Sequence, residues 1–141
     1  MIHFKNLELK ENEDKLIRFL EEHQLENTGI AQKKSSNFSK GLFDDDRYIG
    51  GITASNWMNT THISLLAVDK NYRKSGLGTL LLKEGEAFAQ SQNAEIITIH
   101  TQDYQAKTFY EMHGYSVFGQ LTDSPFHGTT KYYLEKRLPI E

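Results

Sequence analysis

A glycine-rich turn with two basic residues separates an apolar strand-like run from an apolar helix-like run. Arg73 and Lys74 precede Gly76 and Gly78 in the stretch VDKNYRKSGLGTLLLKEGE, residues 68–86. The start of a helix leaves backbone N–H groups unpaired and carries partial positive charge, so small residues there let a phosphate approach the backbone. A plain strand-to-helix turn also uses glycines, for their backbone angles. The spacing alone leaves both interpretations open.

Two common phosphate motifs do not match this turn. A Walker loop needs lysine directly after its second glycine, and here Thr79 follows Gly78. A dinucleotide-binding fingerprint needs a small residue where Leu81 stands. It also needs an acidic residue at the end of the next strand, whereas Glu95 opens that strand. The pattern that remains is R-x-x-G-x-G, beginning at Arg73.

A tyrosine and several histidines are the side chains that could transfer protons. Tyr110 lies on the apolar face of a predicted helix, where it is either a core tyrosine or a general acid. Histidine titrates near neutral pH and suits a general base. The candidates are His100 and His62, which we rank above His127. The chain has no cysteine, which excludes disulfides, a cysteine nucleophile and a thiolate metal site. Its six histidines lack a ligand spacing, so we expect no metal.

The apolar pattern predicts the elements that must position these side chains, within a single domain spanning 1–141. The run 62–68 is nearly all apolar, which is typical of a strand covered on both faces. The predicted strands are 2–9, a hairpin over 37–57 that turns at Asp44 to Asp46, 62–68, 94–101, 115–120 and 129–138. The predicted helices are 12–24 with Asn12 as cap, 77–92 with Leu77, Leu80, Leu81 and Phe88 buried, and 104–113 ended by Gly114. This order predicts a mixed α/β sheet with helices on its faces and a right-handed parallel crossover in the middle.

Composition restricts the partners and the compartment. The net charge of -3 and a pI near 6.1 argue against nucleic-acid binding, but allow a locally held anion. No apolar run approaches the roughly 20 residues of a membrane span, and the N-terminus lacks the apolar stretch of a signal peptide. We therefore expect a cytoplasmic protein with no membrane partner.

Two motifs in the expected order resemble the GNAT superfamily of acetyl-CoA-dependent N-acetyltransferases. The first is R-x-x-G-x-G after the strand ISLLAVD; the second is QAKTFYEMHGY, residues 105–115, which is similar to the family's A-x-x-F/L-Y-E-x-x-G-F/Y helix. The proline-bearing loop before the last strand, YYLEKRL, is similar to small bacterial single-domain members. The resemblance extends from about residue 48 to the end. It implies the GNAT fold, an α/β fold with a mixed sheet of about six to seven strands and helices on both faces.

The resemblance implies that acetyl-CoA lies in a V-shaped opening between strands 63–68 and 96–101, with its pyrophosphate admitted at Gly76 and Gly78. A bulge in the first strand would aim a backbone N–H, that of Val68 or a neighbour, at the thioester oxygen. Many relatives carry asparagine where this chain has Asp103, and a carboxylate is an unfavourable neighbour for pyrophosphate. The implied cofactor-binding residues are Leu66, Ala67, Val68, Arg73, Lys74, Ser75, Gly76, Leu77, Gly78, Thr79, Asp103, Ala106, Phe109 and Tyr110.

The implied reaction is direct transfer of the acetyl group to a primary amine of a small molecule or peptide, in a ternary complex. Tyr110 would protonate the departing thiolate, and His100, His62 or a water chain would take the proton of the amine. Trp57 and His127 are candidate substrate contacts, with sheet packing as the other interpretation of Trp57. A non-catalytic acyl-CoA-binding module is the alternative function. In relatives the final strands often pair subunits, so the resemblance also allows a homodimer.

Overall fold

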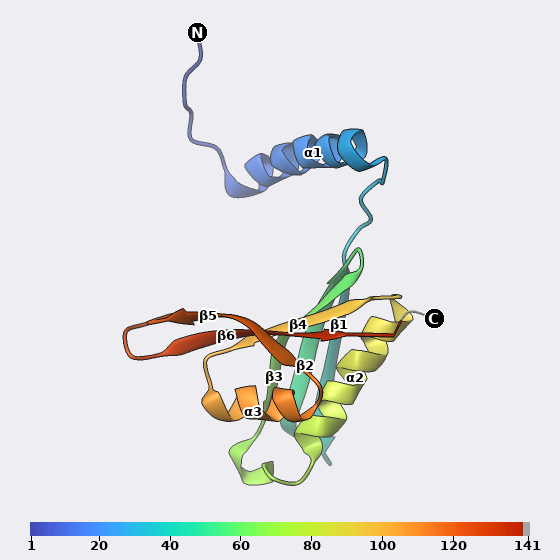
Figure 1. Cartoon of the computed structure of the whole chain (residues 1–141), viewed down its shortest axis with the longest axis vertical. Helices are drawn as coiled ribbons and strands as arrows, with labels where there is room; N and C mark the ends of the chain where they lie inside the picture. The colour runs from blue at the N-terminus through green and yellow to red at the C-terminus, as the bar shows by residue number, and fades with distance from the viewer. Residues whose placement is uncertain (140–141) are drawn as a thin grey trace. The chain divides into compact units, whose positions relative to one another are not determined.

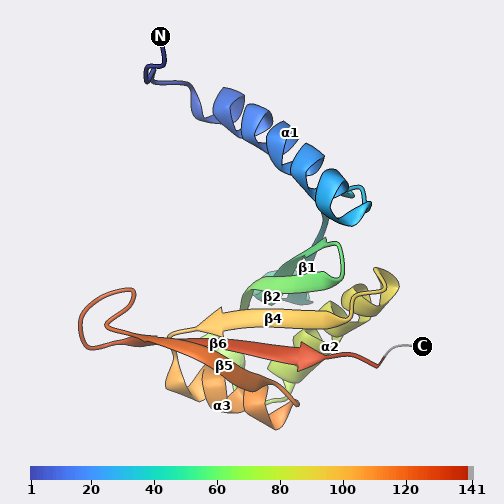
Figure 2. The same ribbon diagram turned by 45° about the horizontal axis from the view of Figure 1, so that its top comes forward.

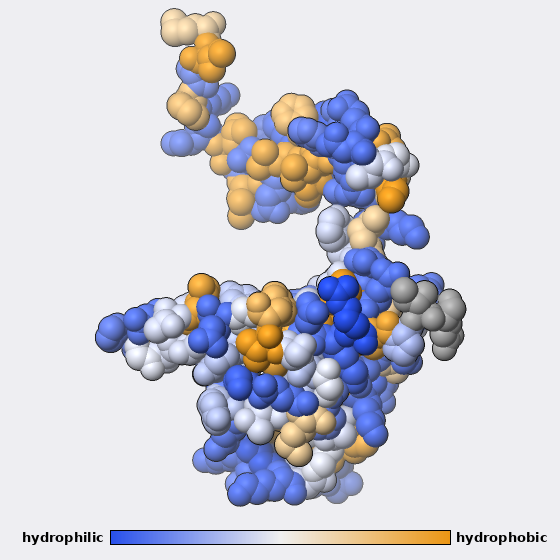
Figure 3. Space-filling model, viewed as in Figure 1, coloured by the Kyte–Doolittle hydropathy of each residue, from blue (hydrophilic) through white to orange (hydrophobic). Residues whose placement is uncertain are grey.

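The computed structural model describes residues 1–139, which divide into two units, Met1–Lys34 and the chain from Ser35 onward (Figure 1). The first unit is the helix α1 (Leu9–Thr28) with its flanking segments. No residue of α1 is buried, and its exposed apolar side chains include Leu16, Ile17 and Leu20. Figure 3 shows orange, hydrophobic areas on this unit.

The start of α1 differs from the sequence prediction. The carboxylate of Glu8 accepts hydrogen bonds from the backbone N–H groups of Lys10 and Glu11, so Glu8 is the cap and Asn12 lies inside the helix. The strand predicted over 2–9 is wrong, because residues 1–8 form no regular secondary structure. Glutamate satisfies the first free N–H groups of the helix earlier in the chain than Asn12 can.

The second unit is built on a six-stranded mixed sheet in the order β1-β2-β3-β4-β6-β5 (Figures 1 and 2). Only the β3–β4 pair is parallel among the strands described, and the β1–β2 hairpin turns at Asp45, as predicted. The strands are β1 (Ser36–Asp44), β2 (Arg47–Trp57), β3 (Thr60–Val68), β4 (Ile96–Thr101), β5 (Ser116–Thr122) and β6 (Thr130–Arg137). This strand count agrees with the predicted sheet.

Two helices cover one face of this sheet, α2 (Leu77–Ser91) over β1 to β3 and α3 (Tyr104–Met112) beside β4 and β5 (Figures 1 and 2). The crossovers β3-α2-β4 and β4-α3-β5 advance in the same direction across the sheet. Right-handed crossovers that advance in the same direction place their helices on the same face. The sequence predicts helices on both faces, and within the second unit α2 and α3 share one.

The core lies between the sheet and these two helices. Among its most buried side chains are Ile52, Ile63, Leu82, Ile97 and Leu134. A Cβ on Gly85 would lie 2.7 Å from the Cδ1 atom of Ile52, so this glycine lets α2 approach β2 closely. In α2 the buried apolar residues are Leu81, Leu82 and Ala89, whereas Leu80, predicted to be buried, is exposed. No helix within residues 1–139 combines the length and apolar character needed to cross a bilayer.

Candidate active site

The strands β3 and β4 pair over a short stretch and then separate. Their last paired residues are His62 on β3 and Thr98 on β4, although both strands continue beyond that point. Past it, β3 is bonded to β2 alone, which leaves its other edge free among the residues described. Within the second unit, Leu65 on this part of β3 is exposed. The V-shaped opening implied by the sequence is thus present in the sheet.

The open part of β3 begins with an irregularity. Ile63 pairs with Ala54 of β2, and Leu65 pairs with the preceding Thr53, so Ser64 is an extra residue that bulges out of the ladder. A bulge bends a strand and re-aims the groups that follow it. The bulge therefore changes the direction of the backbone groups of Leu66, Ala67 and Val68, which follow it. The bulge lies several residues before Val68, the residue named from the sequence.

The first turn of α2 lies just beyond the end of β3 and has no side-chain cap among the residues described. Its N-cap is Gly76, in the left-handed conformation at φ +81°, and the first intrahelical bond runs from the Leu80 N–H to the Gly76 carbonyl. The other two α-helices are capped by carboxylates, those of Glu8 and Asp103. A Cβ on Gly76 would meet nothing within 4 Å. Free N–H groups beside open space form an anion-binding arrangement.

The turn that leads into α2 is held by its own hydrogen bonds. Arg73 donates from Nε to the Val68 carbonyl at 3.4 Å, which ties the turn to the end of β3. The Ser75 hydroxyl donates to the Tyr72 carbonyl, and Lys74 adopts a left-handed backbone at φ +64°. The side chains of Arg73 and Lys74 are exposed, so both cations are available to an anion at this turn.

Gly78, one of the predicted cofactor-binding residues, faces α3. A Cβ at this position would lie 3.4 Å from the Cζ atom of Phe109 on α3. The ring of Phe109 thus lies within van der Waals contact of this position, and a side chain larger than a methyl group would press on it. The backbone N–H of Gly78 still belongs to the uncapped first turn.

Tyr110 of α3 is a buried tyrosine with an unbonded hydroxyl. The residue is 5% exposed, and its ring packs edge-on against Phe109 and Tyr115, at centroid distances of 5.2 and 5.8 Å. Its hydroxyl makes no hydrogen bond within residues 1–139, yet no fully buried side-chain polar atom there lacks a partner, so the hydroxyl oxygen reaches solvent. Burial raises the pKa of Tyr110 to about 12, which keeps the hydroxyl protonated near neutral pH.

His62 and His100 form a pair at the point where β3 and β4 separate. Their rings stack at a centroid distance of 5.2 Å, and the Nδ1 atom of His62 lies 2.9 Å from the Thr98 hydroxyl. Burial lowers the pKa of His62, and the charge of His100 lowers it further. Burial and then the charge of Lys131 lower the pKa of His100. Both rings are therefore neutral near pH 7 and able to accept a proton.

The tyrosine and the histidine pair lie on opposite faces of the sheet. Tyr110 belongs to the core beneath α2 and α3, together with Ile97 and Ile99 of β4. Side chains alternate along a strand, so Thr98 and His100 of β4 lie on the other face.

Residues 8–126 match the sequence profile described as the acetyltransferase (GNAT) domain. The chain belongs to the GNAT acetyltransferase family. It is 34% identical over 90 residues to the blasticidin-S acetyltransferase of Streptomyces morookaense; the match covers 63% of this chain and 65% of that protein, less than two thirds of it.

Solved structures share the GNAT fold over most of the chain. An acetyltransferase from Bacillus cereus has 27% identity and a TM-score of 0.80, covering 97% of this chain and 98% of that one. A putative acetyltransferase from Agrobacterium tumefaciens has 23% identity and a TM-score of 0.75, covering 98% and 99%. The second shows likeness of fold alone. The family and the fold class that the sequence predicts are therefore confirmed.

The structure places the remaining predicted site residues of this GNAT domain as follows. Trp57 ends β2 opposite Thr60, at the far end of β3 from Val68. His127 lies in the β5–β6 loop with a 94% exposed side chain, and its Nδ1 atom lies 3.4 Å from an Asp123 carboxylate oxygen. Asp103 caps α3 by accepting from the backbone N–H of Gln105 at 2.8 Å, so its carboxylate is engaged in the helix. Ala106 packs against the core, one helical turn before Tyr110.

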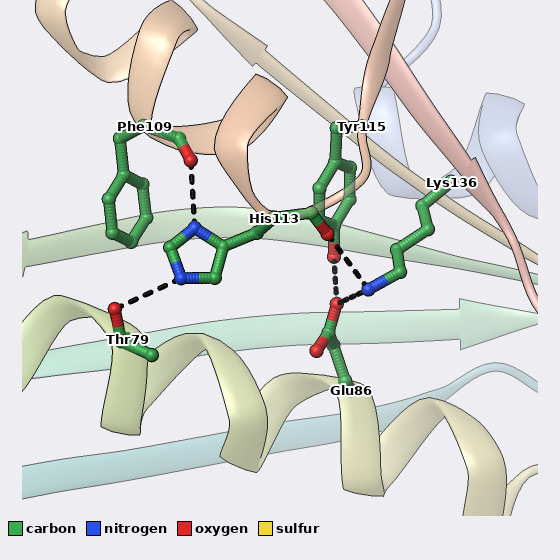
Figure 4. Close-up of polar contacts among 6 residues, drawn as sticks. All are labelled: Thr79, Glu86, Phe109, His113, Tyr115 and Lys136. Atoms are coloured by element: carbon green, nitrogen blue, oxygen red, sulfur yellow. Dashed lines mark hydrogen bonds and ion pairs between the residues drawn. The ribbon is translucent and has the colours of Figure 1, made fainter.

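A group of polar contacts between α2 and α3 was missed by sequence reasoning (Figure 4). It joins the first turn of α2 to the end of α3 and to β6 through Thr79, Glu86, His113, Tyr115 and Lys136. The only signal in the sequence is that His113 follows Phe109 by one helical turn, which places both on one face. Their partners come from segments far apart in the chain, so spacing could not reveal them.

Proposed function

We propose that this GNAT protein is an acetyl-CoA-dependent N-acetyltransferase that transfers the acetyl group directly to a primary amine, within a ternary complex. The observation that carries the proposal is the uncapped first turn of α2 just beyond the end of β3, whose last residues have separated from β4. This arrangement offers a pyrophosphate site and an open strand edge side by side. Tyr110 and the histidine pair supply proton-transfer groups on either face of the sheet.

The pyrophosphate would bind to the free N–H groups of Leu77, Gly78 and Thr79, where the helix carries partial positive charge. Arg73 and Lys74 would add side-chain charge at the exposed turn. The pantetheine arm would then run along the free edge of β3, where backbone groups lack a β4 partner. No metal is needed for any of these contacts.

In the chemical step the amine nitrogen attacks the thioester carbon, a C–N bond forms and the C–S bond breaks. A backbone N–H of β3 after the bulge, at Leu66 to Val68, would stabilise the oxyanion, a contribution of about 2.7–4 kcal/mol in other acyl transfers. His62 or His100, or a water chain, would accept the proton that nitrogen loses. The departing thiolate would take a proton from the Tyr110 hydroxyl, which is then restored from solvent.

The acceptor we propose is the amine of a small molecule, because the relative named above acts, by its name, on the antibiotic blasticidin S. A peptide amine is the other acceptor class. A homodimer and a cytoplasmic location fit this proposal, but no contact described above depends on either.

A thiol-release assay over a panel of amines tests the proposal. The panel contains blasticidin S, an aminoglycoside, a polyamine, amino-acid amides and a short peptide, and a reaction without amine measures thioester hydrolysis. We expect at least one amine to release free CoA above that blank, with an equal amount of acetylated product. Calorimetric binding of acetyl-CoA without any turnover would favour a non-catalytic acyl-CoA-binding module. Absence of binding would overturn both functions.

A further inference from the structure

Helices α2 and α3 meet at the first turn of α2, and two contacts join them there (Figure 4). Gly78 faces the ring of Phe109, which would lie 3.4 Å from a Cβ at that position. Thr79, the next residue, has its Oγ1 atom 3.0 Å from the Nε2 atom of His113. The rings of Phe109 and His113 lie against each other at a centroid distance of 4.6 Å. The turn that we assign to pyrophosphate binding therefore rests on the helix that carries Tyr110.

The second nitrogen of His113 determines how the Thr79 contact works. Its Nδ1 atom lies 2.8 Å from the backbone carbonyl of Phe109, and a carbonyl oxygen can only accept. Nδ1 therefore carries a hydrogen, and in a neutral ring Nε2 is the acceptor. The Thr79 hydroxyl must then donate to His113. Its proton is committed to α3 and is not available to a phosphate.

We propose that His113 is a positioning residue, which holds the first turn of α2 through Thr79 and so sets the spacing between the pyrophosphate site and the Tyr110 hydroxyl. This inference rests on the proposed function, because it takes that turn as the pyrophosphate site. It assigns the Thr79 side chain to helix–helix contact and leaves only the Thr79 backbone N–H for the cofactor.

This spacing matters because one cofactor must reach both places in a single bound conformation. The pyrophosphate end is held at α2, and the sulfur at the other end must lie beside Tyr110 on α3. A movement of the first turn relative to α3 displaces the sulfur from the hydroxyl even when the cofactor still binds. Misplacement by about 1 Å can reduce a rate about 100-fold.

A second set of contacts holds the backbone at the end of α3, so that the ring of His113 can extend to the first turn of α2. Lys136 of β6 donates to the His113 carbonyl at 2.9 Å and to the Glu86 carboxylate at 2.8 Å. The Tyr115 hydroxyl donates to the same carboxylate at 2.9 Å. Glu86 lies two helical turns after Thr79, so both face α3. The backbone of His113 is thus anchored to β6 and to the middle of α2, while its ring extends to Thr79.

Two variants of His113 distinguish the contact made by Nε2 from the contact made by Nδ1. The side-chain amide of glutamine reaches about as far as Nε2, and that of asparagine only about as far as Nδ1. His113→Gln should therefore keep the contact to Thr79, and His113→Asn should lose it while keeping a donor near the Phe109 carbonyl. Thr79→Val removes the hydroxyl with little change of shape. Thr108→Val is the matched control, because within residues 1–139 its exposed hydroxyl bonds only to the Tyr104 carbonyl of its own helix.

We expect His113→Asn and Thr79→Val each to raise the Kd for acetyl-CoA about three- to tenfold, the usual range for one lost hydrogen bond. Both should also lower kcat, because the sulfur no longer sits at Tyr110. The double variant should be no worse than either single variant, since the two residues share one contact. His113→Gln should recover most of the loss, and Thr108→Val should match the wild type. Additive effects, or a Kd unchanged in His113→Asn, would overturn the proposal.

A measurement without cofactor separates this inference from the proposed function. Hydrogen exchange at the amides of Leu80 to Leu82, the first bonded amides of α2, should be faster in His113→Asn than in His113→Gln, with circular dichroism confirming that both are folded. Equal exchange would refute the link between the helices whatever the activity. Absence of turnover in the wild type with all amines would reject the proposed function. The exchange and Kd comparisons do not need turnover, so they would still test the role of His113.

Discussion

At the scale of single residues, the same physical cause acts on the proposed acid and the proposed bases with opposite results. Burial disfavours the charged form of a group, so it raises the pKa of Tyr110 and lowers the pKa of His62 and His100. Near pH 7 this leaves a phenol that can donate a proton and imidazoles that can accept one. Opposite roles thus follow from one kind of environment.

Tyr110→Phe removes the proposed acid without changing the shape of the core. Because the ring contacts remain, we expect acetyl-CoA binding to be largely unchanged. The thiolate would leave without a proton donor, so kcat should fall about 100-fold or more, the lower range for a general acid. Stopped-flow turnover and calorimetric binding measure the two quantities. Equal turnover in both proteins would make Tyr110 a core residue only.

The histidine pair should make the protein less stable in mild acid. The pKa of both His62 and His100 is lowered in the folded state, so below the unfolded pKa of about 6.5 the unfolded chain binds more protons. The free energy of unfolding should therefore fall as pH decreases from about 6.5 toward the lowered pKa values. Urea unfolding midpoints at several pH values measure this slope. The double variant His62→Gln/His100→Gln should have a smaller slope. An unchanged slope would show that the pair does not contribute to the pH dependence of stability.

At the scale of elements, substitutions of the two glycines in the α2 turn should affect different kinetic constants. Gly76→Val places a side chain on the open side of an uncapped turn, so the KM for acetyl-CoA should rise about tenfold or more, as for a lost bond to a charged group. Gly78→Val presses on Phe109 and moves α3, so kcat should fall more than KM rises. Gly76→Asn is the control for backbone strain, because asparagine tolerates the left-handed conformation. If Gly78→Val changed only KM, the assignment of Gly78 to helix contact would be wrong.

At the scale of the whole molecule, a ligand that binds the uncapped α2 turn should stabilise the fold. Binding to the folded state alone adds about 2.7 kcal/mol at a ligand concentration of 100 times Kd. For a chain of this length that corresponds to a rise in Tm of roughly 8 °C. Differential scanning fluorimetry with acetyl-CoA and CoA measures the shift, and adenosine without phosphates is the control. An equal shift with adenosine would argue against a pyrophosphate site.

Local patterns in the sequence determined the helices and strands of the second unit and the family. The apolar runs, Gly76 at the start of α2 and Gly114 after α3 could be read correctly because each depends on neighbours in the chain. The start of α1 could not, since asparagine is the preferred capping type and only the actual hydrogen bonds show that Glu8 is the cap.

Tertiary structure alone decided what the turn and the histidines contact. The sequence already placed Gly78, Thr79, His62 and His100 on particular elements. Only the packing of α2 on α3 showed that Gly78 lies against Phe109 and that Thr79 bonds to His113. Only the β3–β4 register brought the two histidines together. The physical reason is that spacing along a chain specifies which face a side chain is on. Which side chain faces it from another element depends on how the elements pack.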